Sequence, residues 1–363
     1  MSKVNISASA LEDAVRQVNI CNACRYCEGF CSVFPSAFSQ RAHSDADVVQ
    51  LANLCHNCRG CYYACQYAPP HEFALNLPKA LAEVRSESWA EFSFPVSLSR
   101  LFQTSGAAIA GSVVVAFALL FALARFVGNV GDETGQGFYQ IMSHSVMVSI
   151  FMPAFLLPFL AIGLGLWRYW QHVGGSWIRP MQVARAMHAA ATMKNLSGGH
   201  GEGCNFEDED KFSNHRRWLH QATMYGFLLC FLSTSSATVM HYVFDLHAPY
   251  PLLSFPKLFG VSGGILMSIG AFGLAWLKTQ ADPKLGDENK WGGEMGFVLL
   301  LGSVGLSGLL LYALGSTPAL EVLLAAHLGT VLALFLLVPY SKMAHGFYRM
   351  AALIRDEQRK SNG

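Results

Sequence analysis

The sequence is poor in charge. Only 13% of its 363 residues are Asp, Glu, Lys or Arg, whereas a soluble domain usually has about 25%. The formal net charge is +1, which argues against a nucleic-acid-binding protein. The charges are also unevenly placed: residues 1–99 hold seven basic and nine acidic residues, but after Arg100 charges occur mainly in short segments between apolar runs. This profile predicts a soluble head fused to a membrane body.

The sequence also lacks a signal peptide and the common motifs of nucleotide-binding and serine-hydrolase sites. The first twenty residues are polar and amphipathic and contain no apolar run of the signal-peptide type, so we expect the head to stay in the cytoplasm. The chain has no G-x-G-x-x-G after a predicted strand, no P-loop and no nucleophile elbow. These absences argue against a dinucleotide, nucleotide or serine-hydrolase site in this chain. A flavin would have to come with a partner.

Eight of the ten cysteines form two copies of one pattern, C-x2-C-x2-C-x3-C, at residues 21–31 and 55–65. In the bacterial ferredoxin run, three closely spaced thiolates hold one [4Fe–4S] cluster and the fourth reaches the other cluster. Disulfides are disfavoured in a reducing cytoplasm. Structural zinc, the main alternative, usually uses two C-x2-C pairs across a longer gap. The spacing therefore predicts two [4Fe–4S] clusters.

In this pattern the fourth cysteine of each run binds the cluster of the other run, and this rule assigns the ligands of both clusters. The first cluster takes Cys21, Cys24 and Cys27 with Cys65, and the second takes Cys55, Cys58 and Cys61 with Cys31. Ser32 and Gln66 stand where the ferredoxin run has proline. The stretch before Cys55 has a capping residue and helical apolar spacing. The head resembles the α-helical ferredoxin domain of succinate dehydrogenase and heterodisulfide reductase subunits more than the small βαββαβ ferredoxins.

Six apolar stretches are long enough to span a bilayer, which takes about 20 residues each. They cover 104–127, 141–166, 219–243, 259–277, 295–315 and 320–347. The connections 168–217 and 278–291 and the tail carry many basic residues, whereas 128–139 has none and 244–257 has only Lys257. The positive-inside rule places both termini in the cytoplasm of a multi-pass protein of the bacterial inner membrane.

Histidines lie near both ends of two of these stretches, and ionisable groups in a bilayer usually indicate function. His327 and His345 are five helical turns apart and would share one face of the last span. His220 lies near the start of the third stretch, and His241 lies near its end. Since these spans run in opposite directions, His220 would face His345 and His241 would face His327, each as the axial pair of a b-type haem. His241 is rotated about 60° from His220, so His144 is an alternative partner for His327.

The string HLGTVLALFLLVPYSKMAH, residues 327–345, resembles the haem-bearing helix of the respiratory nitrate reductase gamma subunit. The resemblance implies that His327 and His345 both bind haem. The partner helix of that family carries its histidines ten residues apart, and the tenth residue after His220 is Cys230. One haem is therefore expected and a second is left open.

The order of parts over the whole chain resembles the citrate/tricarballylate utilization protein B family. This implies a membrane-bound electron-transfer partner of a soluble FAD-dependent dehydrogenase, tricarballylate dehydrogenase, with quinone as acceptor. We thus expect a mostly α protein: an α-helical ferredoxin-like head, residues 1–100, with two [4Fe–4S] clusters, fused to a six-helix transmembrane b-type cytochrome bundle, residues 101–363, with a cytoplasmic loop at 168–217. The dehydrogenase would dock on the head.

The predicted function is an electron relay from that flavoprotein through the clusters and haem to quinone, that is, an electron-transfer subunit of an oxidoreductase. The alternatives are an iron–sulfur and haem redox sensor, a membrane anchor and a zinc-headed membrane protein. A transporter would show paired broken helices, which are not evident. Cys204 is expected to lie in a flexible connection with a free thiol; the alternative is a loop that covers the quinone or contacts the head. Arg216 and Arg217 either pair with haem propionates or anchor their helix at the headgroups.

Overall fold

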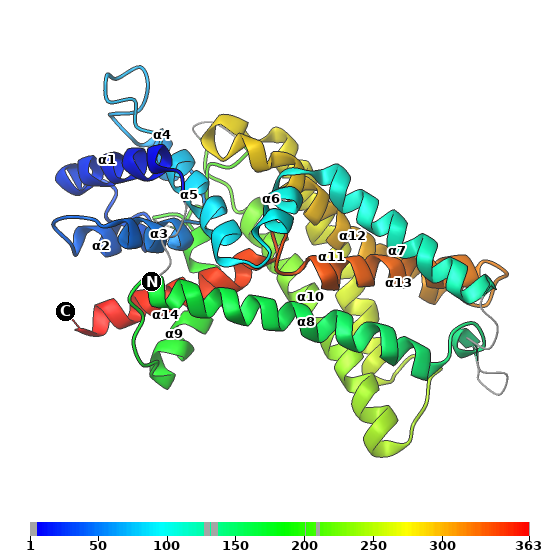
Figure 1. Ribbon diagram of the computed structural model, residues 1–363. Coiled ribbons are helices and arrows are strands. Elements are labelled where there is room, and N and C mark those ends of the chain that lie inside the picture. Colours follow the sequence, from blue (N-terminus) through cyan, green and yellow to red (C-terminus); the bar gives the residue numbers. More distant parts are fainter. Residues whose placement is uncertain (1–5, 127–130, 132–136, 200, 208–210, 363) are drawn as a thin grey trace.

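The computed structural model describes residues 6–126, 131, 137–199, 201–207 and 211–362. Over these ranges the chain is mostly helical, as predicted, and its β structure is one isolated bridge between Cys204 and Ser213. Figure 1 shows a compact group of short helices at one end of a bundle of long helices. The predicted outer connection 128–139 lies mostly outside the described residues.

Five helices build the head: α1 (Ala8–Cys24), α2 (Val33–Phe38), α3 (Asp45–Leu54), α4 (Gly60–Tyr63) and α5 (Leu77–Phe92). The helix expected before Cys55 is α3. It begins with a capping box, in which the Ser44 hydroxyl accepts from the Asp47 N–H and the Asp47 carboxylate accepts from the Ser44 N–H. This arrangement satisfies two amide groups that the first turn of a helix leaves free. The apolar faces of α1, α3 and α5 pack together and fix the ends on which the cysteines lie.

Within the described ranges, six helices are long and apolar enough to cross a membrane, the number expected from the sequence. They are α7 (Gly106–Phe126), α8 (His144–His172), α10 (His215–Phe244), α11 (Phe255–Gln280), α12 (Trp291–Leu314) and α13 (Leu320–Leu337). Both Pro153 and Pro158 lie inside α8, which continues through them. Such prolines are tolerated in membrane helices when neighbouring groups satisfy the freed carbonyls.

The predicted last span, 320–347, is wrong in one respect. Helix α13 ends at Leu337, residues 338–343 form turns, and a new helix, α14 (Ala344–Asn362), follows. Pro339 explains the break, because proline has no N–H to donate to the preceding turn of the helix. His327 and His345 therefore lie on different helices. The five-turn argument for a shared face does not apply to them.

Shorter elements connect these parts: the helices α6 (Val96–Thr104) and α9 (Pro180–Ala191) and the 3-10 turns η1 (Gly137–Gln140), η2 (Lys194–Leu196), η3 (Pro283–Leu285) and η4 (Glu288–Lys290). In Figure 1, α14 and the end of α8 run beside the head. A buried chain of hydrogen bonds joins them: the Tyr169 hydroxyl donates to Gln50, whose amide donates to the Ala352 carbonyl, at 2.7 and 2.8 Å. One hydrophobic core thus includes head helices and the head-side ends of α8 and α14.

Candidate functional site

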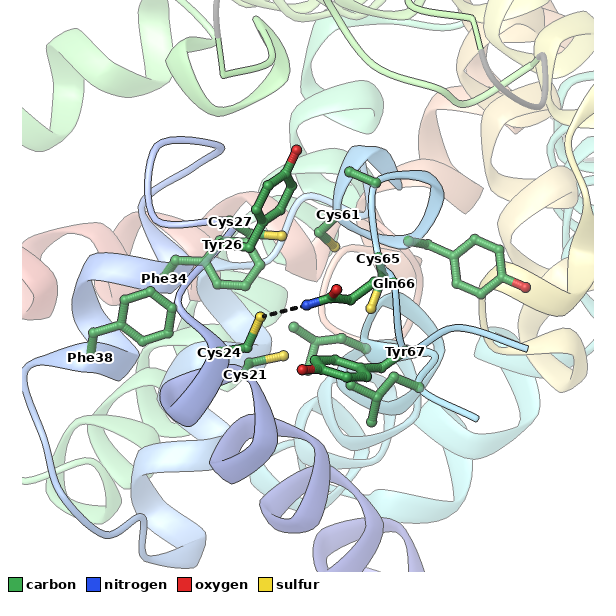
Figure 2. A pocket seen from close by; sticks show the side chains of 14 residues that line it. Cys21, Cys24, Tyr26, Cys27, Phe34, Phe38, Cys61, Cys65, Gln66 and Tyr67 are labelled. Atoms are coloured by element: carbon green, nitrogen blue, oxygen red, sulfur yellow. Dashed lines mark hydrogen bonds between the residues drawn. The ribbon is translucent and has the colours of Figure 1, made fainter. Parts of the chain in front are cut away.

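The first set of cysteines surrounds an open cavity of about 270 Å³. Cys21, Cys24, Cys27 and Cys65 line it, together with Cys61 and aromatic side chains (Figure 2). The chain turns sharply at the end of α1, where Arg25 has a left-handed backbone with φ of 57°. This turn brings Cys27 back toward Cys21 and Cys24. Figure 2 shows the Gln66 amide pointing at the Cys24 sulfur, at 3.9 Å.

The second set repeats this arrangement in a more enclosed place. Cys31, Cys55, Cys58 and Cys61 line a cavity of about 20 Å³, little more than the room for one water molecule. Arg59 repeats the left-handed turn of Arg25, with φ of 68°. The Asn57 N–H donates to the Cys55 sulfur at 3.4 Å. The structure therefore brings together the four cysteines of each predicted set, and Cys61 lines both cavities.

The thiols fit an iron–sulfur centre by donor type. Burial, and then the nearby thiols, raise the pKa of Cys21 and of Cys27 to about 12. Burial likewise raises the pKa of Cys58 to about 11. Without metal these groups are neutral, and iron binding would remove their protons. Among the described residues, no three His, Cys, Asp or Glu side chains converge as they would around a single metal ion. The ligands of a four-iron cluster stand farther apart than those of one ion.

His220 of α10 and His345 of α14 come together at the head-side end of the bundle. Their ring centres are 5.8 Å apart and the rings are nearly perpendicular, at 87°. Nδ1 of His345 lies 2.5 Å from the Lys342 carbonyl oxygen. A carbonyl can only accept, so Nδ1 carries the proton and Nε2 has a free lone pair. Nδ1 of His220 is buried and has no hydrogen-bond partner among the described residues.

This spacing fits two axial ligands. Metal–imidazole bonds of about 2 Å would hold the two ring centres roughly 6 Å apart across an iron. A backbone carbonyl that accepts from the second ring nitrogen is also the usual way of orienting a metal-binding histidine. The pair has this orienting contact at His345.

The two other predicted ligands do not meet each other. His241 stacks on His144 with ring centres 3.9 Å apart and lies edge-on to His247 at 4.4 Å. His327 lies on α13, and its Nδ1 is 3.1 Å from the Ser307 hydroxyl of α12. The structure thus pairs His241 with His144, not with His327. Stacked rings at 3.9 Å leave no space for an iron between them, so the residues do not fit a second bis-histidine haem at that end.

Three arginines complete the site, and sequence reasoning missed two of them. Arg349 and Arg85 both donate to the Cys55 carbonyl oxygen, at 2.7 and 2.9 Å. Arg216 donates to the carbonyls of Asn57 and His56, at 2.7 and 3.1 Å. The only signals in the sequence are the spacings Arg216-x3-His220 and His345-x3-Arg349, which put each arginine one helical turn from a histidine. Arg217, predicted to share the role of Arg216, instead donates to the Thr192 carbonyl at 2.9 Å.

The connection 168–217 is not simply a flexible link. Cys204 is fully buried, and the Asn205 N–H donates to the Cys58 carbonyl at 3.0 Å. The Phe206 ring lies under the guanidinium groups of Arg59 and Arg216, at 4.6 and 4.0 Å. The expected free thiol of Cys204 is confirmed, but this thiol lies in a packed segment and not in a flexible connection. This segment covers the second set of cysteines.

Comparisons with known proteins identify the family. A family model described as "Citrate utilization protein B" matches residues 105–362, and one described as "Citrate utilization protein B Fer4-like domain" matches residues 14–91. The chain belongs to the citrate utilization protein B family. A relative from Escherichia coli with that name is 42% identical over 371 residues, which cover 100% of this chain and 97% of the relative. No solved structure matches.

Family membership confirms the resemblance expected from the sequence. The Fer4-like match contains both cysteine runs, so it supports an iron–sulfur head. The other match begins at residue 105, where the first long apolar helix begins at Gly106. The chain is thus a membrane protein of this family, with a helical Fer4-like domain before the six long helices found in the part of the chain that the structure describes.

Proposed function

We propose that the protein is a membrane-bound electron-transfer subunit that passes electrons from a reduced flavoprotein dehydrogenase to quinone. The observation that carries the proposal is the shared network of the second cysteine set and the His220–His345 pair. Arginines one turn from each histidine bind the loop that contains Cys55. If the cysteine set binds a cluster and the histidine pair binds haem, this continuous network would hold two kinds of one-electron carrier close together.

The chain's own residues would supply the ligands and the surroundings of each cofactor. The two cysteine sets would hold two [4Fe–4S] clusters, and His220 and His345 would hold one b-type haem. These groups accept and release single electrons when bound. The Asn57 and Gln66 N–H groups point at ligand sulfurs and would stabilise their negative charge. The segment that includes Asn205 and Phe206 would keep water from the second cluster.

The partners and orientation belong to the same proposal. The Escherichia coli relative is named for citrate utilization, and the family resemblance implies a dehydrogenase of a tricarboxylate, such as tricarballylate dehydrogenase, as electron donor. The chain shows no flavin-binding motif, so the flavin would arrive with that partner, docked on the head. The basic residues at 168–217 and in the tail support a cytoplasmic head and cytoplasmic termini in the bacterial inner membrane.

Anaerobic purification in lipid nanodiscs tests the proposal. We expect about eight non-haem irons per chain from two four-iron clusters, one haem, and haem reduction when a short-chain menaquinol is added. A colourless protein that contains zinc would contradict the proposal. So would a coloured protein that reacts with neither quinol nor quinone, because that behaviour indicates a sensor or an anchor. Cys230→Ser, which lies in a membrane helix away from the head, is the control for handling losses.

A further inference from the structure

We propose that the Cys31/Cys55/Cys58/Cys61 centre is the one that exchanges electrons with the membrane body, and that Arg85, Arg216 and Arg349 raise its reduction potential. The Cys21/Cys24/Cys27/Cys65 centre, called the outer centre below, then receives electrons from the docked flavoprotein. This order rests on the proposed relay, and it assigns an electrostatic role to three arginines. The transfer would be a one-electron exchange between the groups held by two sets of residues: the inner centre (Cys31, Cys55, Cys58 and Cys61) would give up one electron, and the haem held by His220 and His345 would take it up.

The first argument is that hydrogen bonds join the loop at residues 55–57, here called the inner loop, to the two helices that carry the histidine pair. Arg216 lies on α10 one turn before His220, and Arg349 lies on α14 one turn after His345. Both reach residues 55–57, that is, Cys55 of the inner centre and the two residues between it and Cys58. The helices that carry the histidines therefore hold this loop directly. No corresponding hydrogen bond joins either helix to residues 21–27 among the described residues.

The second argument is charge. Within the described ranges, Arg85, Arg216 and Arg349 form no ion pair with a carboxylate, although Arg85 is only 5% exposed. Their guanidinium groups face backbone carbonyl oxygens instead. A cluster becomes more negative on reduction, so nearby buried cations stabilise the reduced form. At the outer centre, a neutral amide, Gln66, donates to the Cys24 sulfur.

The third argument is access. The outer cavity is open, and Tyr26 beside it is 70% exposed. Arg25, the counterpart of Arg59 in the first run, is exposed at the same surface and donates to the Asn22 carbonyl. The inner cavity is small and lies beneath the segment that contains Asn205 and Phe206. Among the described residues, the outer centre is thus the more accessible of the two to a soluble partner.

A redox titration of matched variants tests the order, with clusters followed by electron paramagnetic resonance and haem by visible absorbance. Arg349→Gln removes one cation from the inner loop. We expect it to move one cluster transition to lower potential and to shift the haem transition, since Arg349 lies one turn from His345. Gln66→Leu should move the other cluster transition and leave the haem unchanged. Arg217→Gln, which alters a neighbouring cation bound to Thr192, should move none of them.

Two further variants separate charge from structure. Arg85→Gln removes a cation from the same Cys55 carbonyl but lies on the head helix α5, so it should move the same cluster transition as Arg349→Gln even if the latter fails to fold. Arg349→Lys keeps the charge and should restore most of the wild-type potential. The inference is overturned if the arginine variants leave both cluster transitions in place, or if they move the transition that Gln66→Leu moves. A wild-type protein without clusters or haem would instead refute the proposed function.

Discussion

Arg216 and Arg349 bind neighbouring carbonyl groups of one loop from two different helices. Arg216 reaches His56 and Asn57, and Arg349 reaches Cys55. Each arginine is one turn from a histidine of the facing pair, so the loop, the two helices and the two imidazoles form one unit. A hydrogen bond to a charged group contributes about 1.5–3 kcal/mol, and several such bonds would hold the head against the membrane helices in one position.

The histidine pair makes a prediction about haem content. His345→Ala and His220→Ala should each lose all haem, because a bis-histidine site with one ligand missing binds haem weakly. His241→Ala and His327→Ala should keep it, since the structure pairs neither residue with a facing ligand. Haem per chain, measured from the pyridine haemochrome spectrum of purified protein, checks this. Partial haem loss in His327→Ala would mean that a second haem binds at the other end.

The cysteine sets predict which irons are lost together. Cys24→Ala should reduce non-haem iron to about half by removing one cluster of two, and Cys58→Ala should do the same for the other. The two variants should retain different electron paramagnetic resonance signals. Cys230→Ala should keep all iron, since Cys230 packs in the apolar core between membrane helices. The assignment would be wrong if Cys24→Ala and Cys58→Ala left the same signal.

Close packing of α10 on α11 depends on glycine. A Cβ at Gly226 would lie 2.4 Å from the Met267 backbone nitrogen and 2.8 Å from the Gly263 carbonyl oxygen. Gly226→Ala must therefore push the helices apart, at a cost of about 1–3 kcal/mol of stability. Gly111→Ala in α7 is the control, because a Cβ there meets no atom within 4 Å. Thermal unfolding in detergent should show a lower midpoint for Gly226→Ala and none of this loss for Gly111→Ala.

The ion pair between the head and α14 predicts an acid-sensitive contact. Burial alone would raise the pKa of Asp47, but hydrogen bonds from Ser44 and Arg359 lower this pKa below its ordinary value. A carboxylate with a lowered pKa stabilises the fold above its unfolded pKa of about 3.9, and this contribution is lost as the pH falls further. Asp47→Asn should lower the unfolding midpoint at pH 7.

The difference in unfolding midpoint between Asp47→Asn and wild type should become smaller below about pH 4, where wild-type Asp47 itself becomes protonated. Unfolding midpoints measured for both proteins between neutral and acidic pH check this. An equal difference between the two proteins at every pH would show that the Asp47–Arg359 pair, with its 2.7 Å N–O distance, does not supply this part of the stability. Arg25→Gln, an exposed arginine of the head, serves as the control.

Local patterns in the sequence were enough for most of the long helices and for the two cysteine runs. The cysteine spacing, the Ser44 cap and the lengths of the apolar stretches are properties of neighbouring residues, so they predicted two ligand runs, helix α3 and six long helices. The break at Pro339 was also local, but prolines occur inside α8 without ending it. What differs is that Pro339 is followed by the polar Ser341 and Lys342, where the apolar stretch has ended.

Only the tertiary structure decided which contacts join the head to the rest of the chain. Arg349 meets Cys55, Arg216 meets Asn57 and Asn205 meets Cys58 across long separations in the chain, and no periodicity relates such residues. His241 turned toward His144 for the same reason: the rotation of a helix about its axis is set by the packing of its neighbours. Sequence spacing determines which side chains share a face of one helix, whereas contact between helices depends on how their surfaces fit together.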